Sequence, residues 1–100
     1  MLKHILLLGF SPEYKGEKLE ETVADLKKRF SALAADMKHD GLISIELGQN
    51  VNGGEFDIAL VSLFTEETAL QRYQVHPIHM EIKEQMNRYV VRRACVDYQE

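Results

Sequence analysis

The hydrophobic positions of the chain predict four β-strands. Residues 2–10 are apolar at almost every position, which is typical of a strand that is buried on both faces. Residues 56–64 share this two-sided pattern, and residues 90–98 form the last expected strand. Residues 42–48 instead alternate between apolar and polar positions and lead into the turn signal of Asn52-Gly53-Gly54. The apolar face expected in this alternating strand comprises Ile43, Ile45 and Leu47.

Helical periodicity occupies the segments between the strands. Asp40-Gly41 supplies a helix stop after the first helix, and Thr65 is expected to cap a short helix that runs through Tyr73. Pro77 is tolerated at the first position of a helix, so we expect a further helix from Pro77 to about Tyr89. The apolar stripe of the first helix comprises Leu19, Val23, Leu26, Phe30, Leu33 and Met37, at spacings of three and four.

The order of strand, helix, strand, strand, helix pair and strand indicates an α+β protein with the ferredoxin-like split βαβ fold. This fold has a four-stranded antiparallel sheet with its helices on one face, and residues 1–100 form one such domain without linker or repeat. An antiparallel sheet with a single covered face shows clean alternation, whereas two of these strands are apolar on both faces. We therefore expect a homodimer in which the open sheet faces pack together as a dimeric α+β barrel.

The amino-acid composition limits the kinds of partner that we expect for this chain. Hydrophobic residues make up 45% of the chain, which is more than a lone domain of this size buries easily. Twelve basic and sixteen acidic residues give a net charge of -4 without a basic, aromatic-rich surface, so no nucleic-acid partner is expected. The single cysteine and the lack of a membrane-spanning apolar run predict a cytoplasmic protein with no membrane partner.

The densest group of reactive side chains surrounds Pro77. Tyr73, His76 and His79 lie within seven residues, and His79 would be the third residue of a helix. The positive end of the helix dipole disfavours an imidazolium there, so we expect a neutral ring that can remove a proton beside a carbonyl. The Tyr73 hydroxyl could hydrogen-bond the developing enolate oxygen. His4 faces the same cleft if its side of the sheet carries the helices.

Four segments carry a family resemblance, namely Met1-Leu2-Lys3-His4-Ile5, Asp57-Ile58-Ala59-Leu60-Val61-Ser62, residues 70–79 and Val96-Asp97-Tyr98. They resemble the stress-responsive dimeric α/β-barrel family, known as Dabb. The resemblance spans the whole chain and implies a barrel-like homodimer with a role in stress responses. In a plant polyketide cyclase of this family, a tyrosine and a histidine perform an aldol condensation without metal or organic cofactor. The matching positions are Tyr73 and His79, with His4 and His76 matching cleft residues, whereas the substrate-tunnel residues do not recur.

Three functions are compatible with this sequence. The first is a cofactor-independent lyase or cyclase for a small apolar carbonyl compound, with Tyr73 and His79 as catalytic residues and His4 and His76 as ligand-binding residues. The second is a non-catalytic stress-response or ligand-binding dimer, since a His-Pro step is also an ordinary helix start and Tyr73 an ordinary packing residue. The third, a monooxygenase, is suggested by fold analogy alone.

Other reactive residues receive plainer interpretations. His4, His76 and His79 lack a carboxylate or cysteine at a recognised metal-ligand spacing, so no metal is expected. The Cys95 thiol is expected to be buried and inert.

The paired arginines of the last strand are also interpreted conservatively. Either Arg92 or Arg93 must point inward or toward a partner sheet. We expect it to pair with an acidic residue such as Glu46 or Asp57, and anion binding is the alternative.

Overall fold

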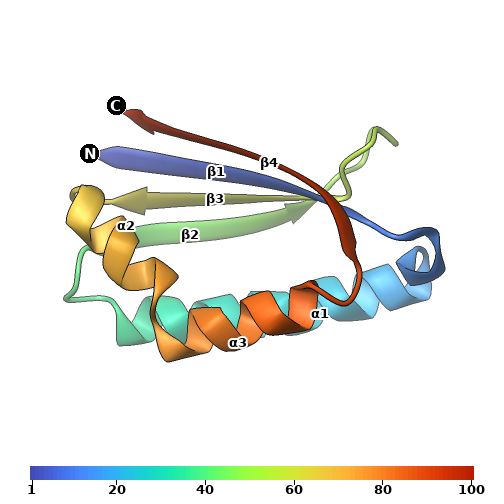
Figure 1. Cartoon of the computed structure of the whole chain (residues 1–100), viewed down its shortest axis with the longest axis horizontal. Helices are drawn as coiled ribbons and strands as arrows, with labels where there is room; N and C mark the ends of the chain where they lie inside the picture. The colour runs from blue at the N-terminus through green and yellow to red at the C-terminus, as the bar shows by residue number, and fades with distance from the viewer.

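The computed structural model describes residues 1–100 and has the expected architecture of a four-stranded antiparallel sheet with helices on one face (Figure 1). The sheet order β2-β3-β1-β4 is that of the ferredoxin-like split βαβ fold, so this prediction is confirmed. No helix has both the length and the apolar character needed to cross a bilayer. The elements in chain order are β1 (Leu2–Phe10), a 3-10 turn (Pro12–Tyr14), α1 (Glu17–Asp36), β2 (Leu42–Gln49), β3 (Ile58–Phe64), α2 (Glu67–Gln74), α3 (Pro77–Met86) and β4 (Val90–Gln99).

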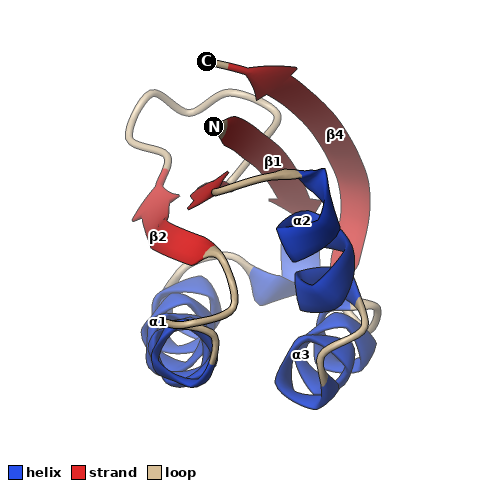
Figure 2. Ribbon diagram, turned by 90° about the vertical axis from the view of Figure 1, so that its left-hand side faces the viewer, coloured by secondary structure: helices blue, strands red, loops and turns tan.

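The core lies between the sheet and α1. The apolar stripe predicted for α1 is buried, and Leu26 and Leu33 are fully inaccessible to solvent. β1 occupies the centre of the sheet and pairs with both β3 and β4, so Leu6 lies opposite Leu60 on one side and Cys95 on the other. Figure 2 shows α1 beneath the β2 side of the sheet and α3 beneath the β4 side.

The second face of the sheet carries apolar side chains and no covering element. The core cluster contains 20 of the 45 hydrophobic residues, so more than half of them lie outside it. Val96 in β4 is 58% exposed, and Ile5 and Val61 at the centre of the sheet are only partly covered. The uncovered face therefore has the composition of a surface that is normally buried against a partner. It includes Ile5, Leu7, Ala59, Val61, Leu63, Ala94, Val96 and Tyr98.

Two local predictions for the sheet were wrong. The pairing of β2 with β3 shifts between Leu42 and Ser44, so Leu42 is buried and Ile43 is 45% exposed. Ile45 and Leu47 still pack against the core. A bulge of this kind adds one residue to a strand, and the alternating pattern of the sequence does not reveal it. In addition, β3 begins at Ile58, so Phe56 precedes the strand instead of belonging to it.

The helix boundaries also differ from the predictions. Glu66, and not Thr65, is the N-cap of α2. The backbone N–H of Thr65 donates to the Gly41 carbonyl at the end of the sheet. α3 ends at Met86, and Tyr89 is buried in the turn that follows.

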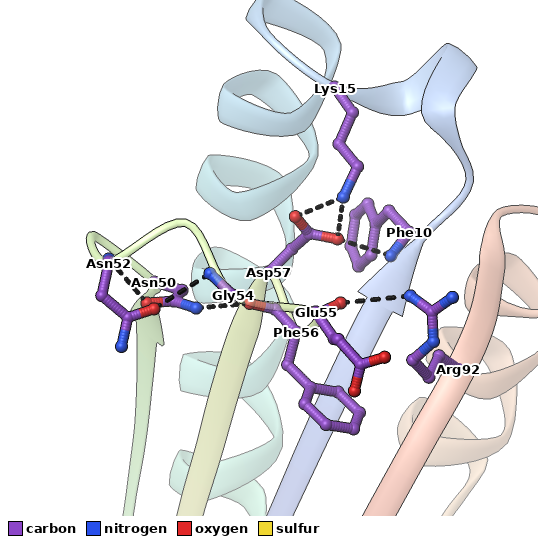
Figure 3. A network of polar contacts seen from close by, with 9 residues as sticks. All are labelled: Phe10, Lys15, Asn50, Asn52, Gly54, Glu55, Phe56, Asp57 and Arg92. Carbon is purple, nitrogen blue, oxygen red and sulfur yellow. Dashed lines mark hydrogen bonds and ion pairs between the residues drawn. The ribbon is translucent and has the colours of Figure 1, made fainter.

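A buried carboxylate ties the β2–β3 connection to the end of β1 (Figure 3). Asp57 accepts a hydrogen bond of 2.6 Å from the Phe10 backbone N–H, and both of its oxygens lie 2.5 Å from Lys15 Nζ. Asp57 therefore pairs with Lys15, and the predicted pairing with an arginine of the last strand was wrong. Arg92 instead donates to the backbone carbonyl of Glu55.

We expect Asp57→Ala to lower the free energy of unfolding by about 2 kcal/mol, because it removes a charge-assisted bond and leaves the buried Phe10 N–H without an acceptor. Glu81→Gln, at a largely exposed ion pair with Arg29, is the control and should change it by less than about 0.5 kcal/mol. Urea denaturation at one fixed protein concentration measures both. Equal effects of the two substitutions would show that Asp57 does not anchor this connection.

Candidate functional site

A cavity of about 470 Å³ lies between α3 and the adjoining strands β1 and β4. It exists because α3 packs on α1 and α2 and leaves the helix-facing side of β4 uncovered. Its lining is mainly apolar and includes no aspartate or glutamate. The lining residues are His4, Leu6, Leu8, Tyr73, Gln74, Val75, His79, Met80, Lys83, Met86, Asn87, Val90, Arg93 and Cys95.

His79 is the third residue of α3, as the sequence predicts, and its side chain lines the cavity. Its Nδ1 lies 3.2 Å from the Gln74 carbonyl oxygen, which can only accept, so Nδ1 carries the proton and Nε2 carries the lone pair. Burial lowers the pKa of His79, the Gln74 carbonyl opposes this, and the charges of Lys83 and Arg93 lower the pKa further. His79 is therefore a neutral ring with a free base nitrogen at neutral pH.

Tyr73 comes from the buried face of α2 and packs against His79. Its spacing of three and four residues from Leu70 and Ala69 places all three side chains in the core. The ring centroids of Tyr73 and His79 are 4.5 Å apart, and Tyr73 is 1% exposed. Its hydroxyl has no hydrogen-bond partner in the protein. Burial raises the pKa of Tyr73, so the side chain stays a phenol that can donate a hydrogen bond to an acceptor.

His4 lies on the β1 wall of the cavity and is held by the last strand. The β1–β4 register places it opposite Asp97, and its Nδ1 contacts Asp97 Oδ1 directly. The Cys95 sulfur lies 3.7 Å from the same nitrogen and 3.8 Å from that carboxylate oxygen. His4, Cys95 and Asp97 thus form one compact group of imidazole, thiol and carboxylate, the donor types that bind zinc.

Cys95 is exposed, so the prediction of a buried thiol was wrong. The reason is that β4 is an edge strand whose helix-facing side forms the cavity wall. Partial desolvation raises the pKa of the Cys95 thiol, and the Asp97 carboxylate adds to this effect. A thiol with a raised pKa is a poor nucleophile at neutral pH, which agrees with the predicted lack of reactivity.

His76 lies outside the cavity. Its Nδ1 accepts a hydrogen bond of 3.1 Å from the Ile78 backbone N–H, which caps α3, and its Nε2 lies 2.5 Å from a carboxylate oxygen of Asp36 at the end of α1. Both ring nitrogens are therefore engaged in holding two helices together. The structure brings Tyr73, His79 and His4 together but not His76, so the three histidines do not form a joint metal site.

Several residues that shape the site have no local signal in the sequence. Asp97 reaches His4 only through the pairing of the first and last strands. Lys83 follows His79 by one helical turn, a spacing that could have indicated a shared face. Arg93 was noted in the sequence, but its position on the cavity wall depends on the register of β4.

Comparison with known proteins identifies one family and several solved structures. A family model described as "Dabb: Stress responsive A/B Barrel Domain" matches residues 2–100. A dimeric protein of unknown function with a ferredoxin-like fold from Bacteroides fragilis is 30% identical, with a TM-score of 0.88 over 99% of this chain and 95% of that one. No curated protein matches the chain.

Two further structures are similar in fold. A dimeric ferredoxin-like protein of unknown function from Thermobifida fusca is 21% identical, with a TM-score of 0.81 over 99% of this chain and 90% of that one. A Dabb family protein with a ferredoxin-like fold from Mesorhizobium loti is 18% identical, with a TM-score of 0.78 over 99% of this chain and 95% of that one.

We expect the imidazole of His79 to titrate below the pKa of about 6.5 of an unperturbed histidine. Because the unfolded chain takes up this proton first, His79 makes the protein lose stability as the pH falls through about 6.5. The unfolding free energy of wild type should therefore decrease more between about pH 7 and about pH 5.5 than that of His79→Gln. His39→Gln, at an exposed histidine after α1, is the control. NMR titration of His79 at or above about 6.5 would contradict this expectation.

Proposed function

The chain belongs to the stress responsive A/B barrel (Dabb) domain family, and on that basis we propose that it is a homodimer whose cavity binds a small apolar carbonyl compound and performs acid–base chemistry of the aldol or cyclase type on it. The observation that carries this proposal is the pairing of a buried phenol that has no partner with a neutral histidine in one cavity. A buried hydroxyl without a partner lowers stability, and a ligand that accepts its hydrogen bond would remove this cost.

The proposed chemistry uses only side chains of the cavity. The Nε2 lone pair of His79 removes a proton from the carbon beside the carbonyl, and the C–H electron pair moves into the carbonyl to form an enolate. The Tyr73 hydroxyl donates a hydrogen bond to the oxygen that becomes negative. The enolate carbon then attacks a second carbonyl carbon, and the proton on His79 returns to the new alkoxide. His4, oriented by Asp97, lies on the wall beside Tyr73 and contacts the ligand.

The uncovered face of the sheet supports the homodimer. The similar proteins from Bacteroides fragilis and Thermobifida fusca are described as dimeric. In this chain the face opposite the helices is apolar around Ile5, Val61 and Val96. The cavity lies on the other side of the sheet, so each copy would contain a complete site. A free, exposed Cys95 suits the reducing cytoplasm, which we propose as the location.

We expect the wild-type protein to have the mass of two chains in size-exclusion chromatography with light scattering at micromolar concentration. Val61→Lys should give single chains, because it places a charge in the centre of the apolar interface. Val51→Lys is the matched control and should stay dimeric, since Val51 is 98% exposed in the β2–β3 connection. A monomeric wild type would contradict the proposed dimer.

The proposed chemistry predicts catalysed exchange of the α-protons of 2-heptanone in D2O, followed by NMR. His79→Gln should slow the exchange by about 10²-fold or more, because it removes the base. Tyr73→Phe should also slow it without lowering the free energy of unfolding, since the hydroxyl it removes has no partner in the protein.

His39→Gln is the control for loss of a histidine and should exchange at the wild-type rate. A wild-type rate equal to that of buffer would overturn the catalytic proposal. If 2-heptanone still shifted the NMR signals of Tyr73 and His79, the cavity would be a binding site without catalysis.

A further inference from the structure

We infer that the ligand of this cavity is a carboxylic acid, whose carboxylate binds Lys83 and Arg93 while its carbonyl group lies beside Tyr73 and His79. The inference rests on the proposed function in one respect, namely that the cavity is where a carbonyl compound binds. It adds the chemical class of that compound and the direction in which it lies.

The charge of the cavity is opposite to that of the chain. The chain carries a net charge of -4, yet the two charged residues that line the cavity are Lys83 and Arg93, and no acidic residue joins them. Neither forms an ion pair or a side-chain hydrogen bond within the protein. Arg92, the neighbour of Arg93 in the strand, donates to the Glu55 carbonyl. The lysines and arginines that do form ion pairs are Lys3, Lys15, Arg29 and Arg72.

Two cations beside an apolar cavity favour an anion. The walls around them include Met86, Val90 and Leu8, which reduce the hydration of any charge that enters. An interaction between charges becomes stronger as water is excluded. The guanidinium of Arg93 offers a planar pair of donors that matches a carboxylate, and the ammonium of Lys83 adds a second charge from the facing helix.

The cationic end of the cavity is separate from its reactive end. Lys83 lies four residues after His79 on α3, a rise of about 6 Å along the same face of the helix. On the sheet, Arg93 lies opposite Leu8, whereas the partner of His4 is Asp97. Four residues of strand separate these two positions, or about 13 Å. The ligand would therefore lie along β1, with its acid group toward Leu8 and its reacting carbon toward His4.

The shorter separation, from His79 to Lys83 on α3, sets the length of the ligand, because the reacting carbon lies beside His79. A ketone and a carboxylate about 6 Å apart, as the helical rise from His79 to Lys83 suggests, are separated by about three methylene groups. 5-Oxohexanoate has this structure. Its methyl ester has the same carbon chain and ketone but no charge, so the pair of compounds isolates the contribution of the carboxylate.

The test is an NMR titration of the 15N-labelled full chain with 5-oxohexanoate and with methyl 5-oxohexanoate. We expect the acid to bind at least about tenfold more tightly than the ester, because a hydrogen bond to a charged group contributes more than one to a neutral group. Arg93→Gln and Lys83→Gln should each weaken binding of the acid about tenfold and leave binding of the ester unchanged. Added salt should weaken binding of the acid alone.

Arg92→Gln is the matched control, because it removes the same charge from the adjacent position of β4, which does not line the cavity. It should leave the affinity for the acid unchanged. Equal affinities of acid and ester for the wild type would overturn this inference and leave the proposed carbonyl site intact. If neither compound shifted the signals of the cavity residues, the proposed function would fail together with the inference.

Discussion

The antiparallel pairing of the first strand with the last is the interaction on which the rest of this structure depends. It places β1 in the centre of the sheet and brings the two ends of the chain together, where the Glu100 N–H donates to the Met1 carbonyl at 2.9 Å. The same register places Asp97 beside His4 and Arg93 beside Leu8. A shift of one residue would turn these side chains to the opposite face of the sheet. Fold and site are therefore determined by one ladder of hydrogen bonds.

The sheet has a different role on each face. The face toward the helices forms the core where it packs against α1. It forms one wall of the cavity where it faces α3 and β4 is left uncovered. The other face is apolar and has no cover within one chain. This division explains why a chain of 100 residues carries 45% hydrophobic residues. A dimer formed through the uncovered face would bury that surface without closing the cavity.

Features determined by local sequence could be predicted, and features determined by long-range contacts could not. The stripe from Leu19 to Leu33 on α1 and the helix start at Pro77 follow from local periodicity and backbone chemistry. The helix start also makes His79 the third residue of α3, as predicted. His76 has the same local context, but its ring contacts Asp36 of α1 and lies outside the cavity. The bulge at Ile43 likewise depends on pairing with β3, which leaves no local signal. The two cations of the cavity became visible only once β4 and α3 were placed side by side.

The proposed chemistry requires His79 to be a neutral base whose Nε2 is free to take a proton from a ligand in the cavity. A long-range 1H–15N correlation spectrum of the histidine rings at neutral pH tests it most directly, because it identifies which ring nitrogen carries a proton. We expect a neutral His79 ring protonated on Nδ1, with an Nε2 signal that moves when 2-heptanone is added. A His79 ring that is protonated on both nitrogens, or on Nε2 alone, would contradict it.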